Sequence, residues 1–169
     1  LGKFCVLAEV GKLLSRDGDR IWDLLLAVQE NEQESIEVRR RALEAMACFN
    51  TPRIHDLIRQ AYNSPEPNLQ VSALYAMGKT CDPTWLAILI KEMESSDPAM
   101  RHEAVSACVE LGEEDAVPYL IPLVQDDDLQ VQLSAVGALG AIGGSLARRA
   151  LRQCVKAGDE VLQEAAQEA

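Results

Sequence analysis

Apolar residues recur along the chain with a period of 31 residues. One alanine column shows this period most clearly, and its members are Ala42, Ala73, Ala104, Ala135 and Ala166. Further apolar residues stand four positions before, one after and three after nearly every one of these alanines. Such offsets place the side chains on one face of an α-helix. The pattern therefore predicts an amphipathic first helix in each 31-residue unit.

The second half of each unit carries another apolar stripe with helical spacing. Its first column holds Ile54, Trp85, Ala116 and Ala147, and apolar residues follow at most positions three, four and eight residues later. This stripe predicts a second helix. The two helices are separated by one residue column with the character of a turn, which holds Asn50, Cys81, Gly112 and Gly143. Asn and Gly tolerate the left-handed conformation that ends many helices, so Cys81 is the exception.

A residue that can cap a helix N-terminus stands immediately before nearly every first helix. Four of the five are Ser or Asp, residues that cap helix N-termini well, and the column holds Ser35, Glu66, Asp97, Asp128 and Asp159. An earlier helix pair is predicted over 3–15 and 19–30, where the register slips by about two residues. The repeats are therefore placed at about 1–34, 35–65, 66–96, 97–127, 128–158 and, in part, 159–169.

These elements predict an all-α fold, a right-handed α-solenoid of about five two-helix repeats in a single array over residues 1–169. A helix pair cannot bury its apolar stripe alone, so each repeat packs on its neighbours. The chain lacks an initial Met and stops within a helical pattern, so we expect a fragment of a longer protein. Neither end has a polar capping helix, which makes end-to-end self-association a further expectation.

Charge and composition narrow the function. The net charge of −11 argues against nucleic acid, because such binding depends on Lys and Arg neutralising phosphates. Five cysteines with no CxxC spacing argue against a disulfide framework and a zinc site, and are typical of a reducing compartment. No apolar run approaches the roughly 20 residues of a membrane helix. We therefore expect a cytoplasmic protein that binds neither membrane nor nucleic acid.

The repeat resembles a known family. The stretch DPAMRHEAV at residues 97–105 follows a pattern shared by the other units, D-x-x-[VM]-[RQ]-x-x-A-[VL]. This pattern resembles the short HEAT-like repeats of phycobilisome lyases, over at least residues 35–169. The resemblance implies a concave wall lined by the second helices. It implies no particular function, because such repeats mostly serve as binding surfaces.

Two columns beside the apolar stripe of the second helices change character along the chain. The middle two repeats are apolar at both columns, and the outer two carry Arg or His. The columns are His55, Leu86, Val117, Arg148 and Arg59, Ile90, Ile121, Arg152. If both face the concave wall, they bind a partner segment that has an apolar centre and acidic ends. The alternative is that these residues, about 100° from the core stripe, pack against the next repeat.

His102 and Glu103 raise the question of metal chemistry. The pair resembles the His-Glu motif of the deoxyhypusine hydroxylase family, HEAT-like enzymes whose two irons are held by His and Glu from several repeats. The equivalent positions here are Arg40-Arg41, Val71-Ser72, Leu133-Ser134 and Glu164-Ala165. One His-Glu pair does not hold two irons. We therefore expect no metal and interpret His102 and Glu103 as surface residues.

A bilin-lyase-like activity is the other enzymatic interpretation, because the repeat resembles those of phycobilisome lyases. Cys81 is the thiol we expect to be exposed, but the repeat pattern places no His or other strong base near it. We therefore predict a protein–protein interaction scaffold with no catalytic residue and no cofactor. The alternative function is a bilin-lyase-like enzyme or another small-molecule-binding HEAT-like protein.

Overall fold

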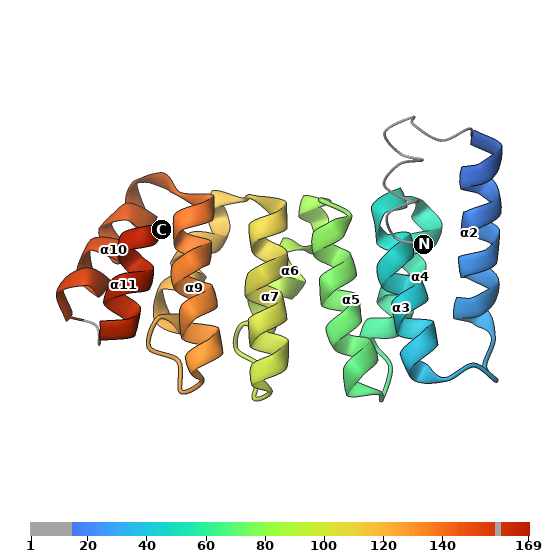
Figure 1. The fold of residues 1–169 in the computed structure, drawn as a ribbon, viewed down its shortest axis with the longest axis horizontal. Helices are drawn as coiled ribbons and strands as arrows, with labels where there is room; N and C mark the ends of the chain where they lie inside the picture. The colour runs from blue at the N-terminus through green and yellow to red at the C-terminus, as the bar shows by residue number, and fades with distance from the viewer. Residues whose placement is uncertain (1–14, 158–159) are drawn as a thin grey trace. The chain divides into compact units, whose positions relative to one another are not determined.

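The computed structural model describes residues 15–157 and 160–169, and every regular element within these residues is a helix (Figure 1). The chain forms two compact units, Leu1–Asp82 and Pro83–Ala169. The helix predicted over 3–15 lies almost entirely outside the described residues, as does Cys5. The predicted repeat boundaries stay a prediction, and so does the single array.

The described part of the first unit, from residue 15 on, holds a long helix followed by one and a half repeats. Its elements are α2 (Ser15–Glu30), α3 (Ile36–Met46), the 3-10 helix η1 (Ala47–Phe49), α4 (Pro52–Tyr62) and α5 (Pro67–Lys79). Helix α3 packs against α2 and α5, and α4 packs against α5 and α3. The edge of the Trp22 ring lies against the Phe49 ring, with centroids 5.2 Å apart, which joins α2 to η1.

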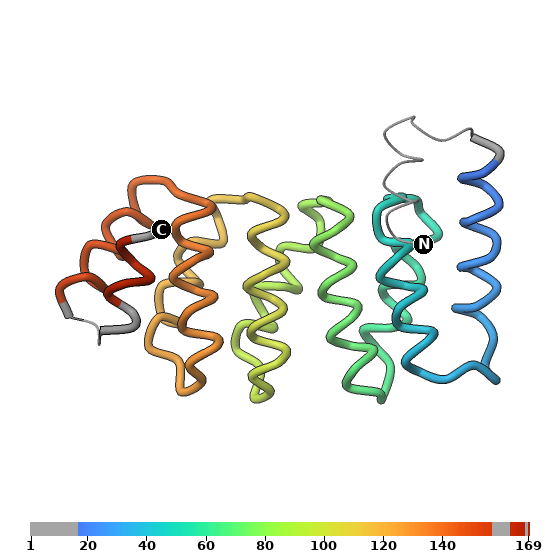
Figure 2. Tube along the Cα trace, viewed as in Figure 1, coloured from blue at the N-terminus to red at the C-terminus, as the bar shows by residue number. Residues whose placement is uncertain are grey.

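The second unit alternates first and second helices. Its elements are η2 (Pro83–Trp85), α6 (Leu86–Glu92), α7 (Pro98–Leu111), η3 (Glu114–Ala116), α8 (Val117–Leu123), α9 (Leu129–Ile142), α10 (Gly144–Ala157) and α11 (Glu160–Glu168). The first helix α9 packs against the first helices α7 and α11 and against the second helices α8 and α10. Figure 2 follows the chain through these turns as a tube. We call α3, α5, α7, α9 and α11 first helices, and α4, α6, α8 and α10 second helices.

The core is built from the predicted columns. Four alanines of the leading column, Ala42, Ala73, Ala104 and Ala135, are at most 3% exposed. The anchor column of the second helices is buried as well, at Ile54, Trp85, Ala116 and Ala147. Two large side chains of the predicted 31-residue columns are exposed, Val38 at 43% and Tyr119 at 48%. Both departures are single positions in columns that are otherwise mostly buried or half-buried, so the helical register is as predicted.

The Arg or Gln of the repeat motif holds the preceding turn. Gln70 Nε2, Arg101 Nη1 and Gln132 Nε2 each donate to the backbone carbonyl six residues earlier, over 2.8, 2.8 and 2.5 Å. In the first described repeat, Arg39 Nε donates to the carbonyl of Gln29 instead. A turn carbonyl that has left the helix needs a partner when partly buried. This motif position therefore closes the turn between successive repeats.

Arg101 also joins two successive turns. Its Nε and Nη2 atoms donate to the two carboxylate oxygens of Asp126 over 2.8 and 2.6 Å, while Nη1 holds the carbonyl of Ser95. Asp126 also accepts from the backbone N–H of Asp128. The paired guanidinium and this N–H hold the pKa of the Asp126 carboxyl below its usual value, and Asp126 in turn raises the pKa of Arg101. The pair therefore fixes the turn before α9 to the side of α7.

The helix ends follow the predicted punctuation. Ser35, Asp97 and Asp128 accept N–H groups of the first turns of α3, α7 and α9. Glu66 is the N-cap residue just before α5, but its side chain makes no capping bond, and Asp159 lies outside the described residues. The column after the first helices adopts positive φ throughout, at Asn50, Cys81, Gly112 and Gly143. Cys81 therefore takes a conformation that costs an L-residue free energy.

We expect Cys81→Gly to raise the free energy of unfolding by about 1 kcal/mol, because glycine adopts φ of 50° without steric cost. Gly112→Ala is the matched reverse change. A Cβ at Gly112 meets no atom within 4 Å, so the loss of about 1 kcal/mol reflects backbone strain alone. Urea unfolding followed by circular dichroism measures both. A destabilised Cys81→Gly variant would show that the thiol contributes more than the backbone costs.

Asp126→Asn should lower the free energy of unfolding at neutral pH by about 2 kcal/mol, because Arg101 loses a charged acceptor. The folded pKa of Asp126 lies below 3.8. Its contribution is therefore full above that value and is lost as the pH falls through the folded pKa. Below pH ~4 the wild type should lose more stability than Asp126→Asn does. The exposed neighbour supplies the control, since Asp127→Asn should leave both stability and its acid dependence close to wild type.

Candidate functional site

An open groove lies across the beginnings of the three second helices of the second unit. Its volume is about 710 Å³. Side chains from η2 and α6, from η3 and α8, and from the start of α10 line it. The apolar side chains that matter most are Leu86, Ile90, Val117, Tyr119 and Leu146, and the charged ones are Glu114 and Asp115. We call this site the N-terminal groove, because it lies at the N-terminal ends of these second helices.

The local sequence explains why the groove lies at the helix beginnings. Near the beginning of each second helix, or at the end of the 3-10 helix just before it, one anchor side chain enters the core. Here the anchors are Trp85, Ala116 and Ala147, all at most 2% exposed. The residues immediately before and after an anchor point away from it, because successive residues are about 100° apart on a helix. Leu86, Val117 and Leu146 are such neighbours. Three anchored helices therefore present their flanking side chains to one shared surface.

The groove surface is apolar with one acidic edge. Tyr119 is 48% exposed and Leu146 is 44% exposed, while Leu86 and Ile90 are half-buried. Glu114 and Asp115 are exposed, and no Lys, Arg or His occurs among the described lining residues. The electrostatic character of the groove is therefore negative.

Glu114 lies against the start of α10. A Cβ atom at Gly144, whose φ is 86°, would stand 3.1 Å from Glu114 Oε2. Only glycine combines this φ with such a close approach at low cost. A carboxylate is favourable at this point, since the beginning of a helix carries partial positive charge. The neighbouring Asp115 is exposed as well and lines the groove.

The structure brings three of the eight predicted partner-binding residues together. Leu86, Ile90 and Val117 line the N-terminal groove, although Val117 is only 3% exposed. Ile121 is half-buried on α8 and is not among the lining residues. Arg148 and Arg152 are exposed on α10 and do not line the groove. Whether these residues bind a partner stays a prediction.

The other two predicted residues belong to the first unit. His55 Nε2 lies 2.8 Å from Asn50 Oδ1 and 3.6 Å from Asp82 Oδ2. Arg59 Nη1 lies 3.6 Å from the carboxylate of Asp56, one turn earlier on the same helix. Both side chains therefore have polar neighbours within their own unit, which accounts for their orientation without a partner.

Sequence reasoning missed several groove residues. Tyr119 was expected in the core because its column holds Leu57, Ile88 and Ala150. The phenol is the only polar group in that column, and this was the one available signal that the side chain reaches solvent. Leu146 shares its column with Arg53, Thr84 and Asp115, and a single leucine in an otherwise polar column predicts an exposed apolar side chain.

His102 and Glu103 are half-buried on α7, so their assignment to the open surface was wrong in part. His102 Nδ1 lies 2.7 Å from Ser134 Oγ on the neighbouring first helix α9. The first unit has a similar link, because Ser72 on α5 donates to Glu44 on α3 over 2.6 Å. Among the described residues, no three His, Cys, Asp or Glu side chains are gathered as a metal site requires. His102 therefore joins two repeats.

The cysteine thiols differ in environment. Cys108 is buried on α7, and this burial raises the pKa of its thiol to about 12. Burial also raises the pKa of the half-buried Cys154. Both thiols therefore stay protonated at neutral pH and are poor nucleophiles. Cys81 is exposed, as predicted.

A family model of HEAT repeats matches residues 86–169. An engineered protein of known structure superposes with a TM-score of 0.60 at 21% identity, over 89% of this chain and 78% of that one. Residues 86–169 therefore carry HEAT repeats. The complex of CpcE and CpcF of phycocyanin lyase, from a Nostoc species, superposes with a TM-score of 0.59 at 18% identity, over 95% of this chain and 65% of that one. The predicted all-α solenoid fold is confirmed.

A sequence relative of this HEAT-like protein changes the functional picture. Deoxyhypusine hydroxylase from Drosophila pseudoobscura pseudoobscura is 27% identical over 117 residues, which are 68% of this chain and 39% of that protein. That relative is an enzyme, and it contradicts the prediction that this protein is not one. The chain spans well under half of the relative's length. None of the helices over residues 15–157 and 160–169 is long and apolar enough to cross a membrane.

His102→Ala and Ser134→Ala should each lower the free energy of unfolding by about 1 kcal/mol, because each removes one partner of the bond between α7 and α9. The double variant should lose less than the sum of the two, as expected for groups that bond to each other. Chemical unfolding of the four proteins measures this coupling. Iron that co-purifies with the wild type and is lost from a stable His102→Ala variant would instead identify His102 as a metal ligand.

Proposed function

We propose that this HEAT-like protein is a binding scaffold and that a partner protein inserts an apolar segment into the N-terminal groove. The observation that carries the proposal is the groove itself, which is lined by the exposed Tyr119 and Leu146 together with the half-buried Leu86 and Ile90. Covering large apolar side chains that are in contact with water lowers the free energy of the complex, so a partner that does this binds favourably. Tyrosine is also among the residues that contribute most to protein interfaces.

The shape of the groove suits an extended or helical segment. It crosses three successive second helices and has no enclosing roof of described residues, so a long ligand can enter from the side. Such a segment would place one or two apolar side chains between α6, α8 and α10. Residues on regular elements hold this arrangement before the partner arrives, which lowers the cost of ordering on binding.

The acidic edge indicates which segment is favoured. The exposed Asp115 and Glu114 line this edge of the groove, so a Lys or Arg in the segment gains a charge partner there. A carboxylate at the same place would be repelled. The groove therefore favours an apolar segment that carries a basic residue, in place of the acidic ends expected from the sequence.

A hydroxylase-like activity is the second candidate, and the match to deoxyhypusine hydroxylase favours it. The His102-Glu103 pair is the feature of this chain that would belong to such a site. The described residues do not fit a two-iron centre, because they place no cluster of three candidate ligands together. Such an activity would need metal ligands beyond those that the described residues gather. Its test is the iron content of His102→Ala described above.

A phage-displayed library of random peptides, selected on the wild-type protein, tests the groove. Enriched peptides are synthesised with a fluorescent label, and their dissociation constants are measured by anisotropy. We expect apolar peptides containing Lys or Arg, whose affinity falls at least about tenfold in Tyr119→Ser and in Leu146→Asp, because both changes remove central contacts.

Leu129→Asp is the matched control, because Leu129 is 52% exposed on α9 of the same unit and does not line the groove. Its affinity should stay within about twofold of wild type. Peptides that bind all three variants equally, or a selection that enriches none, would contradict the proposed groove function. Circular dichroism of each variant verifies that it is folded.

A further inference from the structure

The charges of the second unit are distributed unevenly. Residues 83–169 contain 15 Asp and Glu but only 6 Lys and Arg, a formal net charge of −9. Four of the six cations lie on α10, which contains no acidic residue. These four are Arg148, Arg149, Arg152 and Lys156, and all are exposed. We call them the cationic face of α10.

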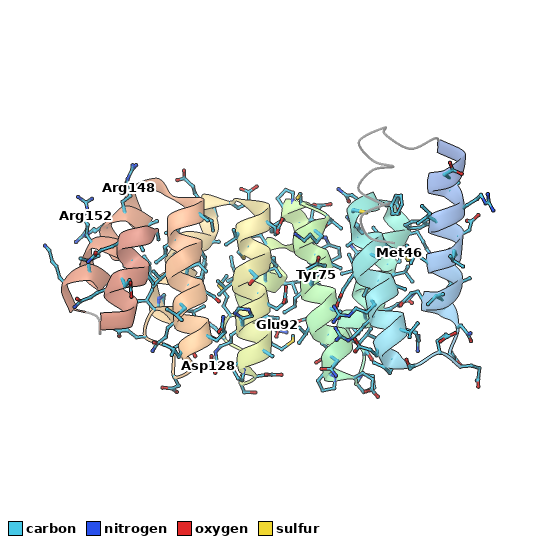
Figure 3. The ribbon with its side chains drawn as sticks, in the orientation of Figure 1. Met46, Tyr75, Glu92, Asp128, Arg148 and Arg152 are labelled. Atoms are coloured by element: carbon cyan, nitrogen blue, oxygen red, sulfur yellow. The ribbon has the colours of Figure 1, made fainter. Side chains whose placement is uncertain are left out.

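The other two cations of the unit have carboxylate partners. Lys91 Nζ lies 3.0 Å from Glu92 Oε1, and Arg101 is paired with Asp126. On the cationic face, Arg152 Nε donates a hydrogen bond to the backbone carbonyl of Arg148, one turn earlier. In Figure 3 the side chains of Arg148 and Arg152 extend outward from α10 into the surrounding space. The acidic unit thus leaves its largest cationic cluster facing solvent.

The spacing of these cations is unfavourable for the helix itself. Arg148, Arg152 and Lys156 follow each other at intervals of four residues, which places them on one side of α10. Like charges at this spacing repel and destabilise a helix. Glutamate is abundant elsewhere in this unit and would relieve the repulsion at any of these positions. A partner that neutralises the row accounts for an arrangement that helix stability alone disfavours.

We propose that the cationic face of α10 is a docking surface for an acidic protein segment. The row from residue 148 to residue 156 extends about 12 Å along the helix, which matches three carboxylates spaced one turn apart on a partner helix. The charges are exposed and close together, so they attract an anionic partner over about a Debye length, ~8 Å in physiological salt. Arginine adds paired hydrogen bonds to a carboxylate.

The surroundings favour a short acidic segment over a nucleic acid. A nucleic acid continues far beyond 12 Å, and the unit that contains α10 carries a formal net charge of −9. Phosphates that extended past the row would meet this negative potential. A short peptide ends where the cations end. This surface is separate from the N-terminal groove, since none of the four cations lines it.

The test uses the whole 169-residue chain and two labelled alanine-rich peptides of equal length. One carries glutamate at every fourth position, and the other carries glutamine there. Anisotropy titrations should show binding of the glutamate peptide that weakens at least about fivefold between ~20 and ~200 mM NaCl. The glutamine peptide should bind at least about fivefold more weakly at the lower salt concentration.

A triple variant, Arg148→Gln, Arg152→Gln and Lys156→Gln, should lose at least about fivefold in affinity for the glutamate peptide. The control triple variant has the same net charge and replaces three exposed arginines of the first unit by glutamine, at Arg20, Arg41 and Arg53. It should stay within about twofold of wild type. Equal losses in both triple variants would show that only net charge matters and would overturn the proposal.

A labelled single-stranded RNA of ten nucleotides provides the competing probe. Tighter binding of this RNA than of the glutamate peptide, lost in the same triple variant, would identify the face as a nucleic-acid surface and overturn the proposal. Circular dichroism of the triple variant verifies folding, and we expect it to be at least as stable as wild type because the repulsion within α10 is relieved.

Discussion

Close packing of neighbouring helices around a buried column of alanines is the interaction on which the remaining structure depends. A methyl group is small enough to let two helix backbones approach, and Ala73, Ala104 and Ala135 are completely buried. One helix pair leaves half of its apolar stripe in water, so burial is complete only when another repeat is added. Stability in each unit therefore arises between neighbours and extends along the chain.

Polar side chains set the spacing that this apolar packing leaves open. Hydrophobic contact is not directional, so alanine columns alone would permit helices to slide along one another. Arg101 prevents this because it holds the carbonyl of Ser95 and the carboxylate of Asp126 at the same time. His102 and Ser134 add a second bond between α7 and α9. The resemblance of His102-Glu103 to a catalytic motif thus coexists with a structural use of the histidine.

The surfaces with candidate functions are formed by side chains that core packing does not constrain. Beside the buried anchors Trp85 and Ala147 stand Leu86 and Leu146, which the core leaves half-buried and exposed, and both line one groove. The outer side of α10 is equally unconstrained and carries cations in an acidic unit. HEAT-like repeats serve both as scaffolds and as enzymes, and the hydroxylase relative keeps both within this family. The fold determines where functional side chains can stand without determining which function they have.

The sequence by itself determined the all-α repeat fold, the buried columns and the helix ends, because a 31-residue period repeats each local signal several times. The same register predicted that Leu86, Ile90 and Val117 share one surface, and all three line the groove. Only the tertiary structure decided that Tyr119 is exposed, that Ile121 lies outside the groove and that the Glu114 carboxylate lies close to Gly144. Those features depend on how the short helices α6 and α8 begin beside α10, and helical periodicity describes a single helix without its neighbours.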